Sequence, residues 1–281
     1  MTATASDTGP APGPLARRHA ATVHEVRGTV PLLLSHGFGT SQEMWGRLVP
    51  LVEESRSVVL MDHVGAGGSD LSAYDPRRYQ TLRGYAADVA DLLDELALGP
   101  VHYVGHSAGG MIGVLAALAR PELFASLSLV GASPRYLDDD GYVGGFTRAG
   151  VDDLLEAMEA NFFQWSRSLA PVAMANPERP ELAEELAAIF ARTQAQIAVD
   201  FARAIFLSDF RDELPGVSLP THVVQAADDP MVPAAVGRFL HAAIPGSRLS
   251  LLEATGHFPH VSGPDETARA LLGFLDSLAL T

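Results

Sequence analysis

The stretch that decides the fold of this chain is residues 101–113, which read Val-His-Tyr-Val-Gly-His-Ser-Ala-Gly-Gly-Met-Ile-Gly. Its first six residues have the composition of a short buried strand, and residues 108–119 continue in helical spacing. Between them lies Gly-x-Ser-x-Gly, which at a strand-to-helix turn projects the serine hydroxyl from a strained backbone. Glycine at 105 and 109 allows the two backbones to approach closely. We therefore predict that Ser107 is a nucleophile; the alternative is a glycine-rich turn with a capping serine.

Apolar runs and helical patterns alternate on both sides of that turn. The expected strands cover residues 21–27, 30–35, 57–61, 123–130, 221–226 and 248–252. The helices expected to alternate with these strands cover residues 41–54, 83–96, 234–243 and 265–278. This alternation predicts an α/β fold with a doubly wound, mostly parallel sheet and right-handed crossovers.

The alternation stops after Gly131. From residue 133 to about 215 the chain is helical in pattern, and the expected helices at 151–163, 180–191 and 194–206 are separated by breakers such as Asn176-Pro177. A helical cap inserted over the carboxyl edge of the sheet is the simplest interpretation. We therefore divide the chain into a disordered tail (1–20), a first part of the core (21–132), a cap (133–215) and a second part of the core (216–281).

The composition excludes several classes of function. The chain has 281 residues, no cysteine and a net charge of −15, and all of its basic residues are arginine. A thiol nucleophile, a Schiff-base lysine and a P-loop lysine are therefore absent, and nucleic acid or an anionic membrane is an unfavourable partner. No apolar run reaches the length of a membrane span, and residues 1–20 contain no apolar signal segment, so we expect a cytoplasmic protein.

A serine nucleophile needs an adjacent base, and that base needs a carboxylate to orient it. After such a turn the partners follow in the order acid, then histidine. His257 fits because it lies between a late strand and the last helix, with His260 as its neighbour. Asp228 and Asp229 compete for the acid, and the spacing to the Val232-Pro233 pair favours Asp229. An Asp-Pro turn is the alternative explanation of this segment.

Two backbone amides are expected to bind the oxyanion of the reaction. One is the amide of Ala108, directly after the nucleophile. The other comes from the early loop His36-Gly37-Phe38-Gly39, where glycine lets the backbone approach a substrate oxygen, and Phe38 is the expected donor. No cluster of acidic or histidine residues at ligand spacing surrounds His36, so we expect neither a metal ion nor a cofactor.

More specific stretches resemble a known family. Residues 130–137 (Val-Gly-Ala-Ser-Pro-Arg-Tyr-Leu), 144–146 (Gly-Gly-Phe), 206–209 (Phe-Leu-Ser-Asp) and 75–85 resemble the bacterial stress regulator RsbQ and the plant karrikin and strigolactone receptors. The similarity runs from about residue 21 to residue 278. It implies an α/β-hydrolase fold, a working but often slow triad at positions matching Ser107, Asp229 and His257, and four cap helices over an apolar pocket.

The resemblance also implies which side chains bind the substrate. The matching positions are Phe38, Tyr136, Trp165, Leu169 and Phe206. Any one of these side chains fits a hydrophobic core as well as a ligand site. Leu169 and Met231 make the predicted pocket less aromatic than that of the plant receptors.

Two hypotheses about function follow. The first is a carboxylic-ester or lactone hydrolase that cleaves a small apolar ester or lactone through an acyl-enzyme. The second is a stress-signalling regulator or ligand receptor that turns its ligand over slowly and binds a protein partner at the cap, which for RsbQ is a PAS-containing phosphatase. Cofactor-free haloperoxidase or carbon–carbon hydrolase activity is a weaker alternative. Acidic side chains crowd the start of the cap, either as a partner site or as a solvated face: Asp138, Asp139, Asp140, Asp152, Asp153, Glu156 and Glu159.

Overall fold

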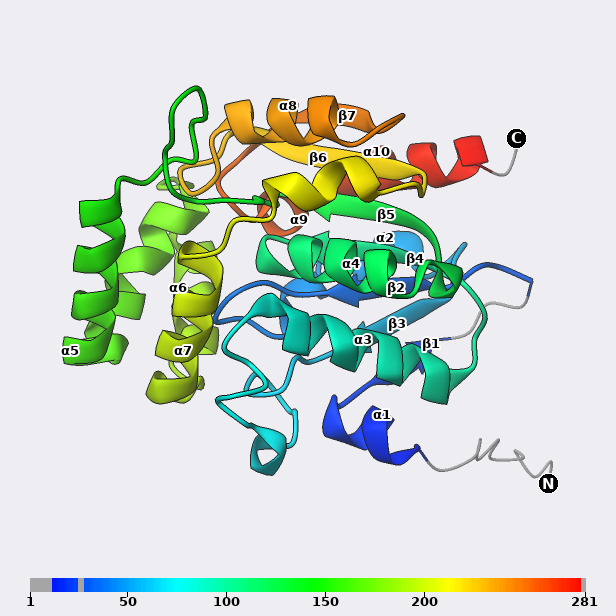
Figure 1. The fold of residues 1–281 in the computed structure, drawn as a ribbon, viewed down its shortest axis with the longest axis horizontal. Coiled ribbons are helices and arrows are strands. Elements are labelled where there is room, and N and C mark those ends of the chain that lie inside the picture. Colours follow the sequence, from blue (N-terminus) through cyan, green and yellow to red (C-terminus); the bar gives the residue numbers. More distant parts are fainter. Residues whose placement is uncertain (1–11, 25–27, 279–281) are drawn as a thin grey trace.

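The computed structural model describes residues 12–24 and 28–278 of the chain. Within those ranges the strands form a seven-stranded sheet in the order β1-β3-β2-β4-β5-β6-β7 (Figure 1). β1 is antiparallel to β3, and all other neighbours are parallel. The strands are β1 (Thr22–His24), β2 (Leu32–Ser35), β3 (Val58–Met61), β4 (Val101–His106), β5 (Phe124–Val130), β6 (Thr221–Asp228) and β7 (Arg248–Thr255). The predicted doubly wound, mostly parallel α/β fold is confirmed.

Helices cover both faces of this sheet (Figure 1). α3 (Leu82–Leu96), α4 (Ala108–Ala119) and α8 (Ala234–Ala243) pack on one face, and α2 (Val49–Val52) and α10 (Pro264–Leu278) pack on the other. A strand enclosed in this way must be apolar on both sides. This requirement explains why β2 is a continuous apolar run up to its last residue, with every side chain buried.

The helices between β5 and β6 lie together beyond one end of the sheet, at the left of Figure 1. They are α5 (Arg148–Met174), α6 (Pro180–Phe190) and α7 (Ala195–Phe206). α5 is broken at Asn161 (φ −161°, ψ 85°), whose side chain accepts a hydrogen bond from the Gln164 amide at 3.0 Å and so caps a second helix. The expected helix at residues 151–163 ran across this break, and the helix that follows Asn161 and ends at Met174 was missed. No helix in the described ranges is long and apolar enough to cross a lipid bilayer.

The helix expected at residues 41–54 was wrong as a single element. The segment contains a 3₁₀ turn (Gln42–Trp45), started by the Ser41 side chain, which accepts from the Glu43 amide, and then the short α2. Proline has no N–H and is favoured in the first turn of a helix, where that N–H would have no partner within the helix. Pro50 occupies that place in α2, so the chain begins a new helix there instead of continuing an old one.

The disordered tail expected at residues 1–20 was also wrong for its second half. Pro14–Arg18 form a short helix, α1, beside α3. The carboxylate of Glu95 accepts hydrogen bonds from the amides of Leu15 (2.9 Å) and Ala16 (2.7 Å). A carboxylate at a helix N-terminus satisfies N–H groups that otherwise have no partner. Residues 1–11 of the expected tail lie outside the described residues.

Candidate active site

Ser107 occupies the sharp turn between β4 and α4. Its φ of 53° and ψ of −122° lie in a region that residues other than glycine rarely adopt. A Cβ on Gly105 would lie 2.4 Å from the carbonyl oxygen of Gly109, and a Cβ on Gly109 would lie 2.6 Å from that of His36. Only glycine fits at both positions. Close backbone packing therefore holds the strained serine in place.

Ser107, His257 and Asp229 form one hydrogen-bonded chain. His257 Nε2 lies 2.9 Å from Ser107 Oγ, and His257 Nδ1 lies 2.8 Å from Asp229 Oδ2. Because a carboxylate only accepts, Nδ1 carries the ring proton, and Nε2 is free to accept from the serine hydroxyl. Asp229 Oδ1 accepts from the amides of Met231 (2.8 Å) and Val232 (2.9 Å), which fixes the carboxylate.

The two competing aspartates have different surroundings. Asp229 is buried and faces His257, whereas Asp228 is exposed at the last position of β6. The Asp228 carbonyl accepts from the amide of Gly256 at 2.9 Å, so its backbone orders the loop that carries His257. The structure therefore brings Asp229, and not Asp228, to the histidine.

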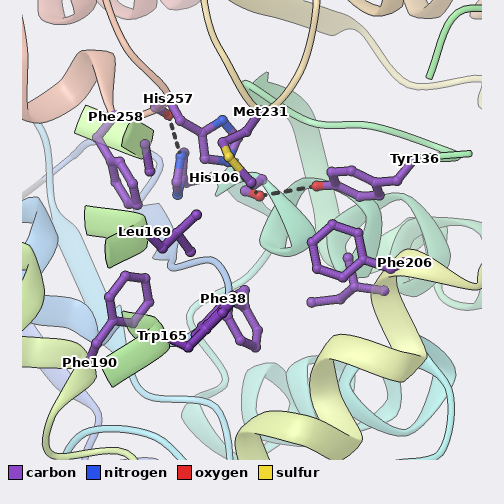
Figure 2. Close-up of a pocket in the computed structure, with 13 residues that line it drawn as sticks. Phe38, His106, Tyr136, Trp165, Leu169, Phe190, Phe206, Met231, His257 and Phe258 are labelled. Atoms are coloured by element: carbon purple, nitrogen blue, oxygen red, sulfur yellow. Dashed lines mark hydrogen bonds between the residues drawn. The ribbon is translucent and has the colours of Figure 1, made fainter. Parts of the chain in front are cut away.

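His257 is held from both the core and the cap. The His106 ring donates from Nε2 to the backbone carbonyl of His257 at 2.8 Å, and the His257 amide donates to the carbonyl of Ala173 in α5 at 2.8 Å (Figure 2). Burial, together with the nearby His260 and His257, holds the pKa of His106 well below its usual value, so His106 is neutral. The sequence analysis did not identify this support. His260 is fully buried against Trp45.

The early loop follows β2, the parallel neighbour of β4, and so lies close to Ser107. A Cβ on Gly37 would lie 2.9 Å from the Cβ of Ser107, which places the following residue, Phe38, beside the serine. Ala108 is the first residue of α4, where an amide has no partner within the helix. Among the groups that the structure describes, neither the Phe38 amide nor the Ala108 amide donates a hydrogen bond. These two amides remain the expected oxyanion donors.

His36 orders this loop. Its Nε2 accepts from the amide of His63 at 3.0 Å, so its Nδ1 carries the proton and donates to the carbonyl of Gly37 at 2.9 Å. Burial lowers the pKa of His36, in agreement with the neutral ring. Both nitrogens are used within the protein, so His36 has no lone pair to offer a metal. No group of three or more His, Cys, Asp or Glu residues in the described ranges is arranged to hold a metal ion.

A cavity with an empty volume of about 490 Å³, including its open mouth, lies against Ser107 and His257 (Figure 2). Its walls come from the core loops and from α5, α6 and α7, and they are mostly apolar. The lining residues are Phe38, His106, Ser107, Tyr136, Trp165, Leu169, Ala173, Phe190, Ile205, Phe206, Met231, His257 and Phe258. All five side chains expected to bind the substrate are among them. The sequence analysis missed Ala173, Phe190, Ile205 and Phe258.

Aromatic contacts connect the cap to the core across this cavity. Phe38, from the early loop, contacts Trp165 of α5 with ring centroids 6.1 Å apart and Phe190 of α6 at 6.2 Å. Tyr136, at the start of the cap segment, packs edge to face against Phe206 of α7 at 5.0 Å. Each pair has the spacing of favourable aromatic packing. The cap helices therefore form the roof of the cavity.

Comparison with known proteins agrees with this geometry. Residues 30–264 match the family model described as the alpha/beta hydrolase fold. The chain is 40% identical to the Karrikin insensitive 2 receptor CA of Petunia hybrida over 87% of this chain and 91% of the relative. It is 39% identical to a strigolactone esterase of Pisum sativum, over 88% and 93%.

Solved structures give the same result. A hydrolase from Oleispira antarctica superposes with a TM-score of 0.91 at 33% identity, covering 94% of this chain and 96% of that one. The enol-lactonase from Burkholderia xenovorans, with a TM-score of 0.78 at 22% identity, shares the fold. The family match, the relatives and the hydrogen-bonded Ser107, His257 and Asp229 lead to one conclusion: the chain belongs to the α/β-hydrolases, and within them to the karrikin and strigolactone receptor-like type.

Proposed function

We propose that this hydrolase cleaves small apolar esters or lactones through an acyl-enzyme on Ser107, with His257 as the base and Asp229 as its orienting acid. One observation carries the proposal: His257 lies 2.9 Å from Ser107 Oγ and 2.8 Å from Asp229 Oδ2, at the wall of an apolar cavity. Residues 133–215 serve as the cap in this proposal. No cofactor is needed for the chemistry.

The hydrogen-bond directions define the first half of the reaction. The Ser107 hydroxyl gives its proton to His257 Nε2 while Oγ attacks the carbonyl carbon. Negative charge moves to the carbonyl oxygen, where the amides of Phe38 and Ala108 donate to it; one such donor typically lowers the barrier by about 2.7–4 kcal/mol. Asp229 stabilises the imidazolium. His257 then protonates the leaving oxygen, and an ester remains on Ser107.

Water completes the reaction by the same route. His257 Nε2 accepts a proton from the water, the water oxygen attacks the acyl carbon, and Ser107 recovers its proton as the acid leaves. Deacylation needs no group beyond those of the first half. His257, held in place by Asp229, therefore acts first as base and then as acid in each half.

The walls of the cavity support the choice of substrate class. Phe38, Trp165, Leu169 and Phe206 are apolar, and none of the arginine, aspartate or glutamate residues that the structure describes lines the cavity. A site of this composition binds an uncharged, mostly apolar molecule and orients it with a few polar groups. Relatives that are named for an activity include a strigolactone esterase and a 3-oxoadipate enol-lactonase of Acinetobacter baylyi, the latter 24% identical.

A panel of p-nitrophenyl esters and butenolides tests this proposal. The wild-type protein should hydrolyse at least one member, and Ser107→Ala should lower kcat by several orders of magnitude, because the triad acts as a unit. Folding should change little, and the melting temperature of the variant is the control. A variant that keeps more than about a tenth of wild-type kcat would contradict nucleophilic catalysis by Ser107, since a general base alone contributes about 10²–10⁴.

A ligand receptor with slow turnover is the second candidate, and the 40% identity to a karrikin receptor favours it. Its partner would bind at the cap. The acidic start of the cap offers less free charge than the sequence suggests, because Asp139, Asp152 and Glu159 are paired with Arg211, Arg148 and Arg203.

A pull-down from the native host with Ser107→Ala as bait, beside kcat/KM on the best ester, separates the two candidates. Absence of a partner together with kcat/KM above about 10⁵ M⁻¹s⁻¹ supports a metabolic hydrolase. A specific partner together with slow turnover supports the receptor.

A further inference from the structure

Ser107 Oγ has a second hydrogen-bond partner besides His257. The hydroxyl of Tyr136 lies 3.2 Å from Oγ, and Figure 2 marks this hydrogen bond with a dashed line from Tyr136, whose ring lies beside Phe206. The direction of this bond follows from the triad. Ser107 donates its only proton to His257 Nε2, so its oxygen accepts and Tyr136 donates.

The position of the Tyr136 hydroxyl is fixed by its surroundings. The ring is buried and packs against Phe206 at 5.0 Å and Phe146 at 6.2 Å, and its backbone carbonyl accepts from the Phe146 amide at 3.1 Å. Burial raises the pKa of Tyr136 well above its usual value, so the hydroxyl keeps its proton. The site therefore contains a neutral donor in contact with a reacting atom.

The other polar groups that line the cavity already have tasks. His106 donates to the His257 carbonyl, and His257 bonds Asp229 and Ser107. The amides of Phe38 and Ala108 face the oxyanion in the proposed mechanism. Among the described side chains that line the cavity, Tyr136 is thus the donor left for a further oxygen of the substrate.

We propose that Tyr136 is a further catalytic residue, whose hydroxyl donates to Ser107 Oγ in the free enzyme and to the leaving-group oxygen in the tetrahedral intermediate. This inference rests on the proposed hydrolase function. Once Oγ is bonded to the acyl carbon it becomes a weaker acceptor, while the leaving oxygen, attached to the same carbon, gains negative charge. A donor already in contact with Oγ is within reach of that oxygen, and hydrogen bonds to charged acceptors are the stronger ones.

The protons and electrons balance without any transfer from Tyr136. When the intermediate collapses, the carbonyl double bond re-forms, and the bond between carbon and leaving oxygen breaks with its electron pair on that oxygen. His257 Nε2 supplies the proton that makes the alcohol. Tyr136 stabilises the oxygen while charge develops there, and it keeps its own proton throughout.

The test is Tyr136→Phe, assayed on butyrate esters that differ only in their alcohol. The variant retains the ring that packs on Phe206. For ethyl butyrate, whose alkoxide is a poor leaving group, kcat/KM should fall by about 10- to 100-fold. For p-nitrophenyl butyrate, whose phenolate needs little stabilisation, kcat/KM should change little. Tyr142→Phe is the matched control, because that hydroxyl donates to the carbonyl of Arg135 at 2.8 Å and does not contact Ser107.

Equal losses for the two esters would overturn the inference and leave Tyr136 as a residue that only orients Ser107. No loss for either ester would overturn it as well. Both outcomes leave the proposed hydrolase standing if Ser107→Ala is inactive. The hydrolase itself fails only if Ser107→Ala retains activity, so the two failures are distinguishable.

Discussion

The core and the cap contact each other and themselves in different ways. At the carboxyl edge of the sheet the chain is so close that a Cβ on Gly37 would lie 2.9 Å from the Cβ of Ser107. In the cap, Trp165 contacts Phe38 only ring to ring, with centroids 6.1 Å apart. Close backbone packing, as at Gly37, permits one arrangement. Contacts between side chains, such as that of Trp165 with Phe38, can adjust when one partner changes size. The core should therefore respond to substitution by losing the chemical step, and the cap by changing which substrate binds.

The largest effect expected on the core side is that of Asp229→Asn. An asparagine there places an amide or a carbonyl against His257 Nδ1 and permits the wrong tautomer, a change that costs about 10⁴ in kcat in serine proteases. Asp228→Asn is the matched control, because Asp228 is exposed and only its backbone contacts the His257 loop. Steady-state kinetics of the two variants provide the check. Equal losses, or a larger loss for Asp228→Asn, would contradict the assignment of the acid.

Gly37→Ala should have the next largest effect. The new methyl group would lie 2.9 Å from Ser107 Cβ and 3.1 Å from the His106 carbonyl oxygen, so the loop must shift and move the Phe38 amide. Loss of one oxyanion donor typically lowers kcat by about 10²–10³. Gly273→Ala in α10, where an added Cβ meets no atom within 4 Å, should leave kcat unchanged. A fully active Gly37→Ala protein would show that the early loop does not contribute to catalysis.

On the cap side, Trp165→Ala should change substrate preference more than rate. Without the indole, a long acyl chain loses apolar contacts at the roof of the cavity, so kcat/KM for long-chain p-nitrophenyl esters should fall by about 10-fold through KM, while acetate-sized esters are spared. Phe163→Ala is the control, because Phe163 lies on the same helix but is 55% exposed. If short and long esters lose activity equally, Trp165 serves only the hydrophobic core.

The smallest expected effect is a decrease in the free energy of unfolding at acidic pH, caused by buried histidines of the core. Burial lowers the pKa of His260 to about 3, and it lowers the pKa of His106 and His36 as well. The unfolded chain therefore binds more protons below pH 6.5 than the folded one, so stability should fall as pH decreases from 6.5 toward the folded pKa. Each such histidine contributes a slope of up to about 1.4 kcal/mol per pH unit.

Urea unfolding between pH 7.5 and pH 5 checks this prediction. Wild-type stability should decrease continuously below pH 6.5, and His260→Gln should show a smaller slope because one of the titrating groups is gone. A stability that does not change over this range would contradict the neutral, buried state of these histidines.

Much of the core could be predicted from the sequence because its signals are local. The Gly-x-Ser-x-Gly turn sets Ser107 between a strand and a helix, and the spacing to Pro233 distinguishes Asp229 from Asp228. Each signal depends on a few adjacent residues. The hydrogen bonds at Ser107, His257 and Asp229 follow once parallel strands bring their carboxyl ends to the same edge.

The remaining features depend on packing that no local pattern encodes. Phe190 and Ile205 lie on cap helices whose apolar faces were recognisable, but which apolar side chains line the cavity depends on how α6 and α7 pack on α5. The segment at 41–54 shows the same limit. Met44, Trp45 and Val52 are buried as the helical spacing predicts, although the backbone forms a 3₁₀ turn and a separate short helix. The hydroxyl of Tyr136 reaches Ser107 for the same tertiary reason.

The central claim, that Ser107 carries the acyl group, is tested most directly by mass spectrometry of the intact protein quenched within the first turnovers of p-nitrophenyl butyrate. The account predicts a single butyryl adduct that peptide mapping places on Ser107, and its absence in Ser107→Ala treated in parallel. An adduct on any other residue would contradict it. So would a wild-type protein in which Ser107 stays unmodified, together with a Ser107→Ala variant that releases p-nitrophenol at the wild-type rate.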